Sequence, residues 1–216
     1  MTANQQAETN DQAQFNGIIV VNKPGQITSA GVVAAVKRIT KANRVGHAGT
    51  LDPFASGLLV VCIGRPATRL IGMLMEGEKT YQARVVLGMV STTQDPEGEI
   101  SPGGPVTGLG RDAIEASLAS FRGVIMQTPP RFSALKHKGV PLYKLARQGR
   151  PVQKPARPVH ITAIDITAVA LPEVHFKVTC SAGTYIRSLC AEIGRELGCG
   201  GHLGRLRRTH SSGFGI

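Results

Sequence analysis

The stretch GHAGTLDPFASGLL, residues 46–59, places a single carboxylate, Asp52, between glycine-rich turns and an apolar run. Pro53 follows directly and pushes the Asp52 backbone away from the α region toward extended geometry. Glycines on both sides permit tight turns: Gly46, Gly49 and Gly57. We expect the apolar residues 58–63 to form a buried strand that anchors the loop. The sequence therefore predicts a carboxylate held on a loop by rigid structure.

Two interpretations of Asp52 follow from its surroundings. In the first, the side chain caps backbone N–H groups in an Asx turn. In the second, the carboxylate acts as a nucleophile and a nearby cation keeps it ionised. Arg187 is the candidate cation, because in CSAGTYIRSL, residues 180–189, it lies on an otherwise apolar predicted helix just after Gly183. Taken alone, Arg187 is equally an arginine with an exposed guanidinium.

Paired carboxylates are the other chemistry to consider, since hydrolysis of a glycosidic bond usually requires two of them. The loop around Asp52 contains no second acid. Three acids follow in TQDPEGE, residues 93–99, and we expect them at a solvated hairpin tip: Asp95, Glu97 and Glu99. The sequence therefore favours a solitary carboxylate over an acid–base pair.

The composition indicates a globular cytoplasmic protein. The chain has 216 residues, 42% of them hydrophobic, and no apolar stretch is long enough to cross a membrane. The polar N-terminus, residues 1–15, is expected to be a disordered tail rather than a signal peptide. The four cysteines lack metal-ligand spacing. We expect them to be buried or partly buried free thiols, with no disulfide and no metal.

Positive charge is concentrated in one stretch. The formal net charge is +11, and residues 131–157, here called the basic segment, contain eight Lys or Arg and no acid. The segment also carries Phe132 and Tyr143 and is rich in Pro and Gly. Cations interleaved with aromatic rings suit a phosphate backbone and its bases. The alternative is a solvated basic face without a ligand.

Hydrophobic periodicity predicts mixed helices and strands. We expect helices over residues 29–39, 67–75, 111–121, 142–148 and 184–197, and strands over residues 17–22, 58–63, 79–87, 160–170, 174–181 and 203–210. Strict βαβ alternation is absent, so the fold class is α+β with a mixed, largely antiparallel central sheet flanked by helices.

Several sequence blocks occur together in one order. NKPGQITS is followed by GHAGTLDPFASGLL, KTYQARVVLG, CSAGTYIRSLCAEIGRELG and GGHLGRLRRTHSSGF. In these blocks the chain resembles the tRNA pseudouridine synthase B family over about residues 17–214. The resemblance implies the pseudouridine synthase fold, and isomerisation of uridine to pseudouridine at position 55 in the T-arm of tRNA. Many members of this family carry a C-terminal extension, often a small RNA-binding domain, and we expect this sequence to end before it.

The resemblance also implies roles for individual residues. Asp52 matches the nucleophile, which would attack a flipped-out base at C6 or its sugar at C1′. Tyr81 matches the tyrosine that stacks on the base, and Arg187 the arginine that pairs with the aspartate and would lower its pKa. Further substrate-binding matches are Lys23, His47, Tyr185 and, more weakly, Leu203. An RNA-gripping insertion is implied at about residues 123–150, with Arg131, Lys136, Lys138, Lys144 and Arg147.

This chemistry involves no redox step and no added water, so we expect neither a cofactor nor a metal. The expected partner, from the resemblance, is tRNA. We expect a monomer, because no long apolar surface stripe stands out in the sequence. A non-catalytic RNA-binding protein or tRNA chaperone on the same scaffold is the main alternative. Such a protein needs the basic segment but not Asp52. An enzyme of the same chemistry acting on other RNAs, alone or with a guide RNA, is a closer alternative. A glycosidase is a more distant one, because it would release free uracil.

Overall fold

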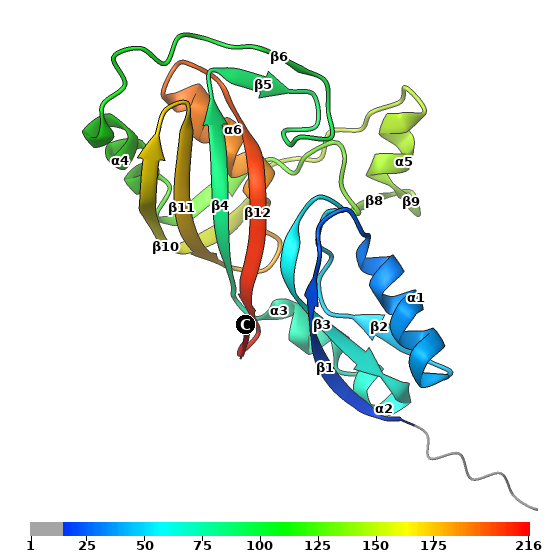
Figure 1. The fold of residues 1–216 in the computed structure, drawn as a ribbon. Coiled ribbons are helices and arrows are strands. Elements are labelled where there is room, and N and C mark those ends of the chain that lie inside the picture. The colour runs from blue at the N-terminus through cyan, green and yellow to red at the C-terminus, as the bar shows by residue number, and fades with distance from the viewer. Residues whose placement is uncertain (1–14) are drawn as a thin grey trace, which may run out of the picture.

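The computed structural model describes residues 15–216 and shows two lobes joined by a continuous sheet (Figure 1). The expected disordered tail, residues 1–15, lies outside the described residues except for Phe15. The small lobe contains β1 to β3 and α1 to α3, and the larger lobe contains most of the remaining chain.

The elements in chain order are β1 (Gly17–Lys23), α1 (Ser29–Thr40), β2 (Val45–His47), β3 (Ser56–Ile63), α2 (Gly64–Thr68), α3 (Ile71–Glu76), β4 (Lys79–Leu87), β5 (Met89–Ser91), β6 (Ile100–Pro102), α4 (Arg111–Ser120), β7 (Gly123–Gln127), β8 (Lys136–His137), β9 (Val140–Pro141), α5 (Leu142–Arg147), β10 (Arg157–Ala170), β11 (Glu173–Cys180), α6 (Ile186–Glu196), β12 (Gly201–Ser211) and β13 (Phe214–Gly215).

The central sheet has the order β1-β3-β12-β4-β11-β10-β7, with β2 paired to β3 and β13 paired to β12. All of its pairings are antiparallel except that of β3 with β12, which is parallel. That parallel contact joins the two lobes and consists of two residue pairs, Arg207 with Ser56 and Arg208 with Gly57. The α+β class and the mixed, largely antiparallel sheet are confirmed.

The small lobe is built around β3, which is buried on both faces. Val32 and Val36 of α1 pack on one face of β3, against Leu59, Val61 and Ile63. The other face packs against Ala67 and Leu74. A strand covered on both faces reads as a continuous apolar run rather than an alternating one. This explains why residues 58–63 were recognisable, and β3 in turn fixes the loop that precedes it.

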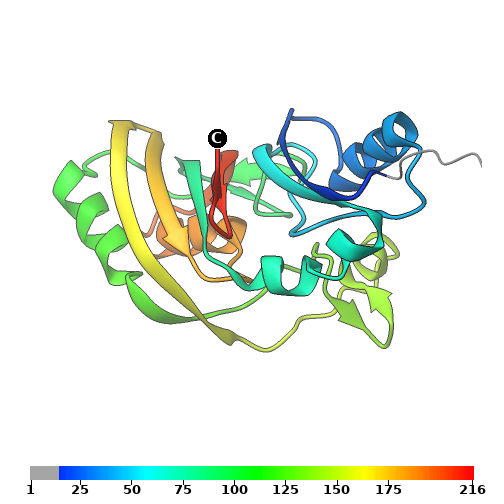
Figure 2. The ribbon, with the colours of Figure 1, turned by 90° about the horizontal axis from the view of Figure 1, so that it is seen from below.

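The core of the larger lobe lies on one face of the sheet, beneath α4 and α6 (Figures 1 and 2). Ile114 and Leu118 of α4 are buried, as is Phe121 at the C-terminal end of that helix. Leu189 and Ile193 of α6 are buried against the same face. All four cysteines are buried free thiols, as expected. Within residues 15–216, no helix is both long and apolar enough to cross a membrane.

Some expectations need correction. The helix expected over residues 67–75 is two short helices, because Leu70 N–H donates to Ala67 O in a tight turn that separates α2 from α3. Residues 123–127, expected within the insertion, form β7 at the edge of the sheet. The sequence did not predict strand β7, because it is short and follows α4 directly. Its exposed residues, Val124 and Met126, are apolar, so the strand shows no alternation of polar and apolar residues. Between β7 and β10 the chain lies outside the central sheet, and this part of the basic segment contains β8, β9 and α5.

Candidate active site

Asp52 lies in the loop between β2 and β3, and several side chains hold this loop in place. Ser29 Oγ, at the start of α1, accepts from Leu51 N–H at 2.9 Å and donates to Leu51 O at 3.1 Å. The fully buried Lys23 ammonium donates to Pro53 O at 3.2 Å. Arg208 donates to Gly49 O at 3.0 Å. The loop is thereby fixed on both sides of the carboxylate.

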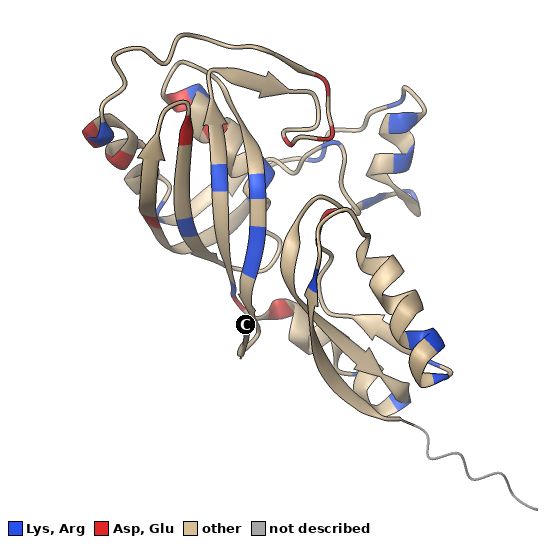
Figure 3. Ribbon diagram, in the orientation of Figure 1, with Lys and Arg blue, Asp and Glu red and all other residues tan. Residues whose placement is uncertain are grey.

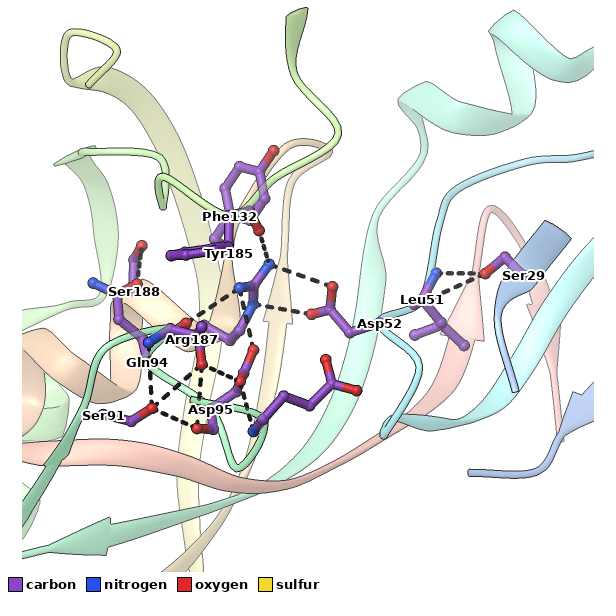
Figure 4. Close-up of polar contacts among 12 residues, drawn as sticks. Ser29, Leu51, Asp52, Ser91, Gln94, Asp95, Phe132, Tyr185, Arg187 and Ser188 are labelled. Carbon is purple, nitrogen blue, oxygen red and sulfur yellow. Dashed lines mark hydrogen bonds and ion pairs between the residues drawn. The ribbon is translucent and has the colours of Figure 1, made fainter. Parts of the chain in front are cut away.

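The Asp52 side chain faces Arg187 and forms a side-on ion pair with it (Figure 4). Arg187 Nε is 3.0 Å from Asp52 Oδ2, and Arg187 Nη2 donates to Asp52 Oδ1 at 3.3 Å. The Arg187 side chain is 5% exposed and that of Asp52 is 30% exposed. The expectation of a cation beside Asp52 is confirmed, and the alternative of an exposed arginine is wrong. Asp52 uses its oxygens for this pair rather than for capping the loop.

A second carboxylate shares the same guanidinium. Arg187 Nη1 is 3.2 Å from Asp95 Oδ2, and the Asp95 side chain is 3% exposed. Asp95 Oδ1 accepts from Thr93 Oγ1 at 2.5 Å and from Glu97 N–H at 3.0 Å. The expected solvated hairpin tip is therefore wrong for Asp95, although Glu97 and Glu99 are exposed. Asp95 turns inward because its loop is drawn onto the start of α6.

The remaining N–H groups of Arg187 donate to backbone carbonyls. Nη1 donates to Thr93 O at 3.2 Å and Nη2 to Phe132 O at 2.9 Å. The start of α6 is itself fixed, since the Gln127 amide exchanges two hydrogen bonds with the Tyr185 backbone. Three chain segments, those of Asp52, Thr93–Asp95 and Phe132, therefore converge on one buried cation, which makes the guanidinium a rigid platform for Asp52.

Burial dominates the protonation behaviour of Asp52. Desolvation raises the pKa of its carboxyl above the ordinary value, and the neighbouring Asp95 adds to this. Arg187 and, to a smaller extent, Lys23 act in the opposite direction. The expectation that Arg187 lowers the Asp52 pKa is correct for that one contribution, but the net shift is upward.

Two cavities meet at Asp52 and Arg187. One, of about 420 Å³, is lined by Tyr81, Tyr185, Leu206 and Arg208. The other, of about 590 Å³, is lined by His47, Phe132, Tyr143 and Arg147. Both volumes fall within the usual range of ligand sites. The carboxylate therefore faces space on both sides while its counter-ion is buried.

Tyr81 points from β4 into the first cavity and is 8% exposed. Burial raises the pKa of its phenol, and the nearby Arg208 guanidinium opposes this shift. Tyr185 lines the same cavity, and the Arg157 guanidinium lies 5.8 Å from its ring centroid. The structure thus brings Asp52, Tyr81, Tyr185 and Arg187 to one place.

The other predicted site residues differ in whether they reach a cavity. His47 lines the second cavity, and burial lowers the pKa of its imidazole. Lys23 holds the loop backbone and lines neither cavity. Leu203 is fully buried in the core of the larger lobe, and Leu206 is the leucine of that strand that reaches the cavity. The functional roles assigned to these residues stay predictions.

The basic segment lies across the cleft from the small lobe, with exposed cations on β8 and α5 (Figure 3). Arg147 lines the second cavity, and its guanidinium lies 5.8 Å from the Tyr143 ring centroid. Arg131 donates to the Gln153 side chain at 3.1 Å. The remaining three candidates are exposed outside both cavities: Lys136, Lys138 and Lys144.

Sequence reasoning missed three buried charged residues of the site, Lys79, Asp95 and Arg208. Arg208 is 1% exposed, and Arg208 Nε donates to Leu58 O at 2.8 Å. A signal for it existed: in a strand, residues two apart share a face, so Arg208 follows the inward-facing Leu206. Asp95 carried no such signal, because its partner is distant in sequence. Among residues 15–216, no group of three or more His, Cys, Asp or Glu is arranged to hold a metal ion.

The fold and the site together define the class of enzyme. The structure is similar to that of the chain in the "Crystal Structure of a Cbf5-Nop10-Gar1 Complex", with a TM-score of 0.72 and 34% identity over 94% of this chain and 50% of that one. A second similar structure is an H/ACA RNP bound to a substrate RNA containing 2′-deoxyuridine, with a TM-score of 0.68 and 31% identity over 92% of this chain and 48% of that one. The fold is that of a pseudouridine synthase.

The sequence comparisons narrow this class. The model of the TruB family pseudouridylate synthase N-terminal domain matches residues 37–186, and that of the tRNA pseudouridylate synthase B C-terminal domain matches residues 187–215. A tRNA pseudouridine synthase B of Desulfotalea psychrophila is 50% identical over 93% of this chain and 83% of its own length. That of Clostridium acetobutylicum is 48% identical over 93% of this chain and 68% of its own length. The chain belongs to the TruB family of pseudouridylate synthases.

Proposed function

We propose that this chain isomerises uridine to pseudouridine at position 55, in the T-arm of tRNA, with Asp52 as the nucleophile acting on a flipped-out nucleotide. The observation that carries this proposal is the Asp52–Arg187 ion pair at the junction of two cavities. The relatives named tRNA pseudouridine synthase B support tRNA as the substrate. The T-arm position follows from the motif resemblance.

The reaction breaks the N1–C1′ bond, turns the base and forms a C5–C1′ bond. The proton lost from C5 is balanced by a proton gained at N1, so no oxidant, reductant or water is consumed. One nucleophile is sufficient because it holds one half of the nucleotide while the other half turns. Arg187 aims the Asp52 carboxylate through two contacts and is itself fixed by Asp95. The buried surroundings exclude water that would hydrolyse an intermediate.

A uridine in a folded tRNA arm has to leave its stack, at a cost of a few kcal/mol. Stacking on Tyr81, which faces the first cavity, would return about 1–3 kcal/mol. Phosphate contacts from the basic segment would supply the remainder, because its cations are exposed and lie across the cleft. Binding of tRNA is therefore expected to weaken steeply as salt concentration rises.

The test is to incubate the protein with an unmodified tRNA transcript and to map pseudouridine along the RNA. We expect one new pseudouridine, at position 55, and none when that uridine is replaced by cytidine. Release of free uracil would instead indicate a glycosidase. Tight tRNA binding without any pseudouridine would favour the non-catalytic RNA-binding protein or chaperone and overturn the proposal.

A further inference from the structure

The small lobe carries a charge imbalance that the site does not explain. Residues 15–76, which end with α3, contain seven Lys or Arg and two acids, Asp52 and Glu76. Apart from Lys23, which holds the catalytic loop, all of these cations are exposed. They form what we call the small-lobe basic surface: Lys37, Arg38, Lys41, Arg44, Arg65 and Arg69. None of the six is in an ion pair with a carboxylate of residues 15–216.

These cations gather at the end of the small lobe that is remote from Asp52. Helix α1 begins at Ser29, which contacts the catalytic loop, and Lys37, Arg38 and Lys41 lie at its other end. A helix of 12 residues is about 18 Å long, so this surface is well separated from the cleft. Gly64 N–H donates to Arg44 O at 2.7 Å, which brings the Arg44 segment beside α2. Figure 3 shows basic residues at the far end of α1, in the turn that follows it, and at α2.

Helix capping accounts for only part of the cluster. Lys37 and Arg38 lie in the last turn of α1, where cations favour the helix dipole. That effect falls off within the last turn of a helix and does not extend to Arg44, which lies beyond it. Like charges held together without counter-charges repel one another, and a surface of this kind attracts polyanions. Between Lys37 and Arg69 the sequence has one Phe, Tyr or Trp, Phe54, and it packs against the core of the larger lobe, so these cations suit phosphates rather than stacked bases.

We propose that the small-lobe basic surface binds the phosphate backbone of the substrate RNA outside the loop that carries the target uridine. This inference rests on the proposed function, because it places the target nucleotide at Asp52. Helix α1 then leads from the cleft to a second anchoring point about 18 Å away. The basic segment grips the RNA across the cleft, and the small-lobe basic surface grips a stem or another arm of the same molecule. These contacts are independent of sequence and depend on salt.

The test compares three variants, each of which loses three exposed positive charges. The first is Lys37→Gln, Arg38→Gln and Lys41→Gln on α1. The second is Arg44→Gln, Arg65→Gln and Arg69→Gln, which leaves α1 unchanged. The matched control is Lys177→Gln, Arg195→Gln and Arg205→Gln on the larger lobe, where the side chains are equally exposed. Affinity is measured against whole tRNA and against its target loop on a short stem, over a range of salt concentrations.

We expect each small-lobe variant to bind whole tRNA about tenfold more weakly and to lower the slope of log K against log salt by about 2–3. The affinity of both small-lobe variants for the short stem-loop should stay within about twofold of the wild-type value. The affinity of the control variant should stay within about twofold for both RNAs. Because the two variants change different elements, either folded variant is sufficient for the test.

An equal loss of tRNA affinity in the control variant would mean that any three exposed cations contribute alike, through the overall positive charge of the protein. That result would overturn the inference. Unchanged tRNA binding by the small-lobe variants, or an equal loss with the short stem-loop, would overturn it as well. Pseudouridine formation is scored separately on the wild type. If the wild type bound tRNA as described but made no pseudouridine, the proposed function would be contradicted. If the wild type made pseudouridine and the small-lobe variants bound whole tRNA as tightly as it does, only the second anchoring point would be contradicted.

Discussion

The guanidinium of Arg187 lies between two carboxylates, with Nε 3.0 Å from Asp52 Oδ2 and Nη1 3.2 Å from Asp95 Oδ2. Asp52 is the more exposed of the two and faces the cavities, whereas Asp95 is enclosed by its own loop. The arrangement separates two tasks. Asp95 holds the cation, and the cation aims the carboxylate that is free to react.

Replacing Arg187 with lysine should therefore damage turnover more than binding. A lysine keeps one positive charge but cannot span both Asp52 oxygens and Asp95. We expect kcat for pseudouridine formation to fall by about 10²–10³, as for loss of a preorganised electrostatic contact, with little change in tRNA affinity.

The matched control is Arg122→Lys, at an exposed pair with Asp165 whose N···O distance is 3.2 Å. Exposed pairs contribute little, so this variant should keep full activity. If Arg187→Lys turned over like the wild type, Arg187 would not be what aims Asp52.

The pH profile should reveal the buried state of Asp52. Turnover needs the ionised carboxylate, so the rate falls as pH decreases through the Asp52 pKa. Burial raises this pKa, which places the acid limb of the profile above the range of an ordinary carboxyl group. Asp95→Asn removes a like charge that contributes to the shift, so the limb should move to lower pH.

The measurement is kcat/KM for pseudouridine formation at a series of pH values between about 4.5 and 8. Glu99→Gln removes an exposed charge from the same loop and should leave the limb in place. Movement of the Asp95→Asn limb to higher pH would contradict the assigned coupling.

Arg208 should act mainly on stability. Its guanidinium donates to Leu58 O and Gly49 O, and methionine at this position would leave both carbonyls unpaired. We expect Arg208→Met to lower the free energy of unfolding in urea by about 2–4 kcal/mol. Arg207 is the adjacent residue on the opposite face of β12 and is partly exposed. Arg207→Met should therefore change the free energy of unfolding by less than about 0.5 kcal/mol. Equal effects of the two substitutions would refute a special role for the buried arginine.

Gly57 is needed where the lobes join. Its φ is +102°, and a Cβ at this position would lie 2.2 Å from the carbonyl oxygen of Arg208. Gly57→Ala should lower the free energy of unfolding by about 2–4 kcal/mol, because β3 and β12 would have to separate. Gly72 lies in α3, where a Cβ would meet no other atom within 4 Å, so Gly72→Ala should stabilise the protein by about 0.5–1 kcal/mol. The comparison requires only thermal or urea unfolding curves.

Local patterns predicted the elements that have strong periodicity or strong end signals. Helix α1 begins where Thr28 caps it, and β10 pairs with β11 as expected. The sequence could not show that Asp95 turns inward, since TQDPEGE has the composition of a solvated turn and its partner lies on α6. The pairing of Asp52 with Arg187 was expected from the site chemistry and the resemblance. The sharing of that cation by a second acid is a product of tertiary packing.

The most direct test of the account uses tRNA labelled with tritium at uridine C5, because isomerisation at this carbon must release the label. Wild-type protein, Asp52→Asn and Asp165→Asn are compared, the last being an exposed acid whose side chain is 64% accessible. The account predicts release by the wild type and by Asp165→Asn, and none by Asp52→Asn despite undiminished tRNA binding. Release by Asp52→Asn at the wild-type rate would contradict the assignment of Asp52 as the nucleophile.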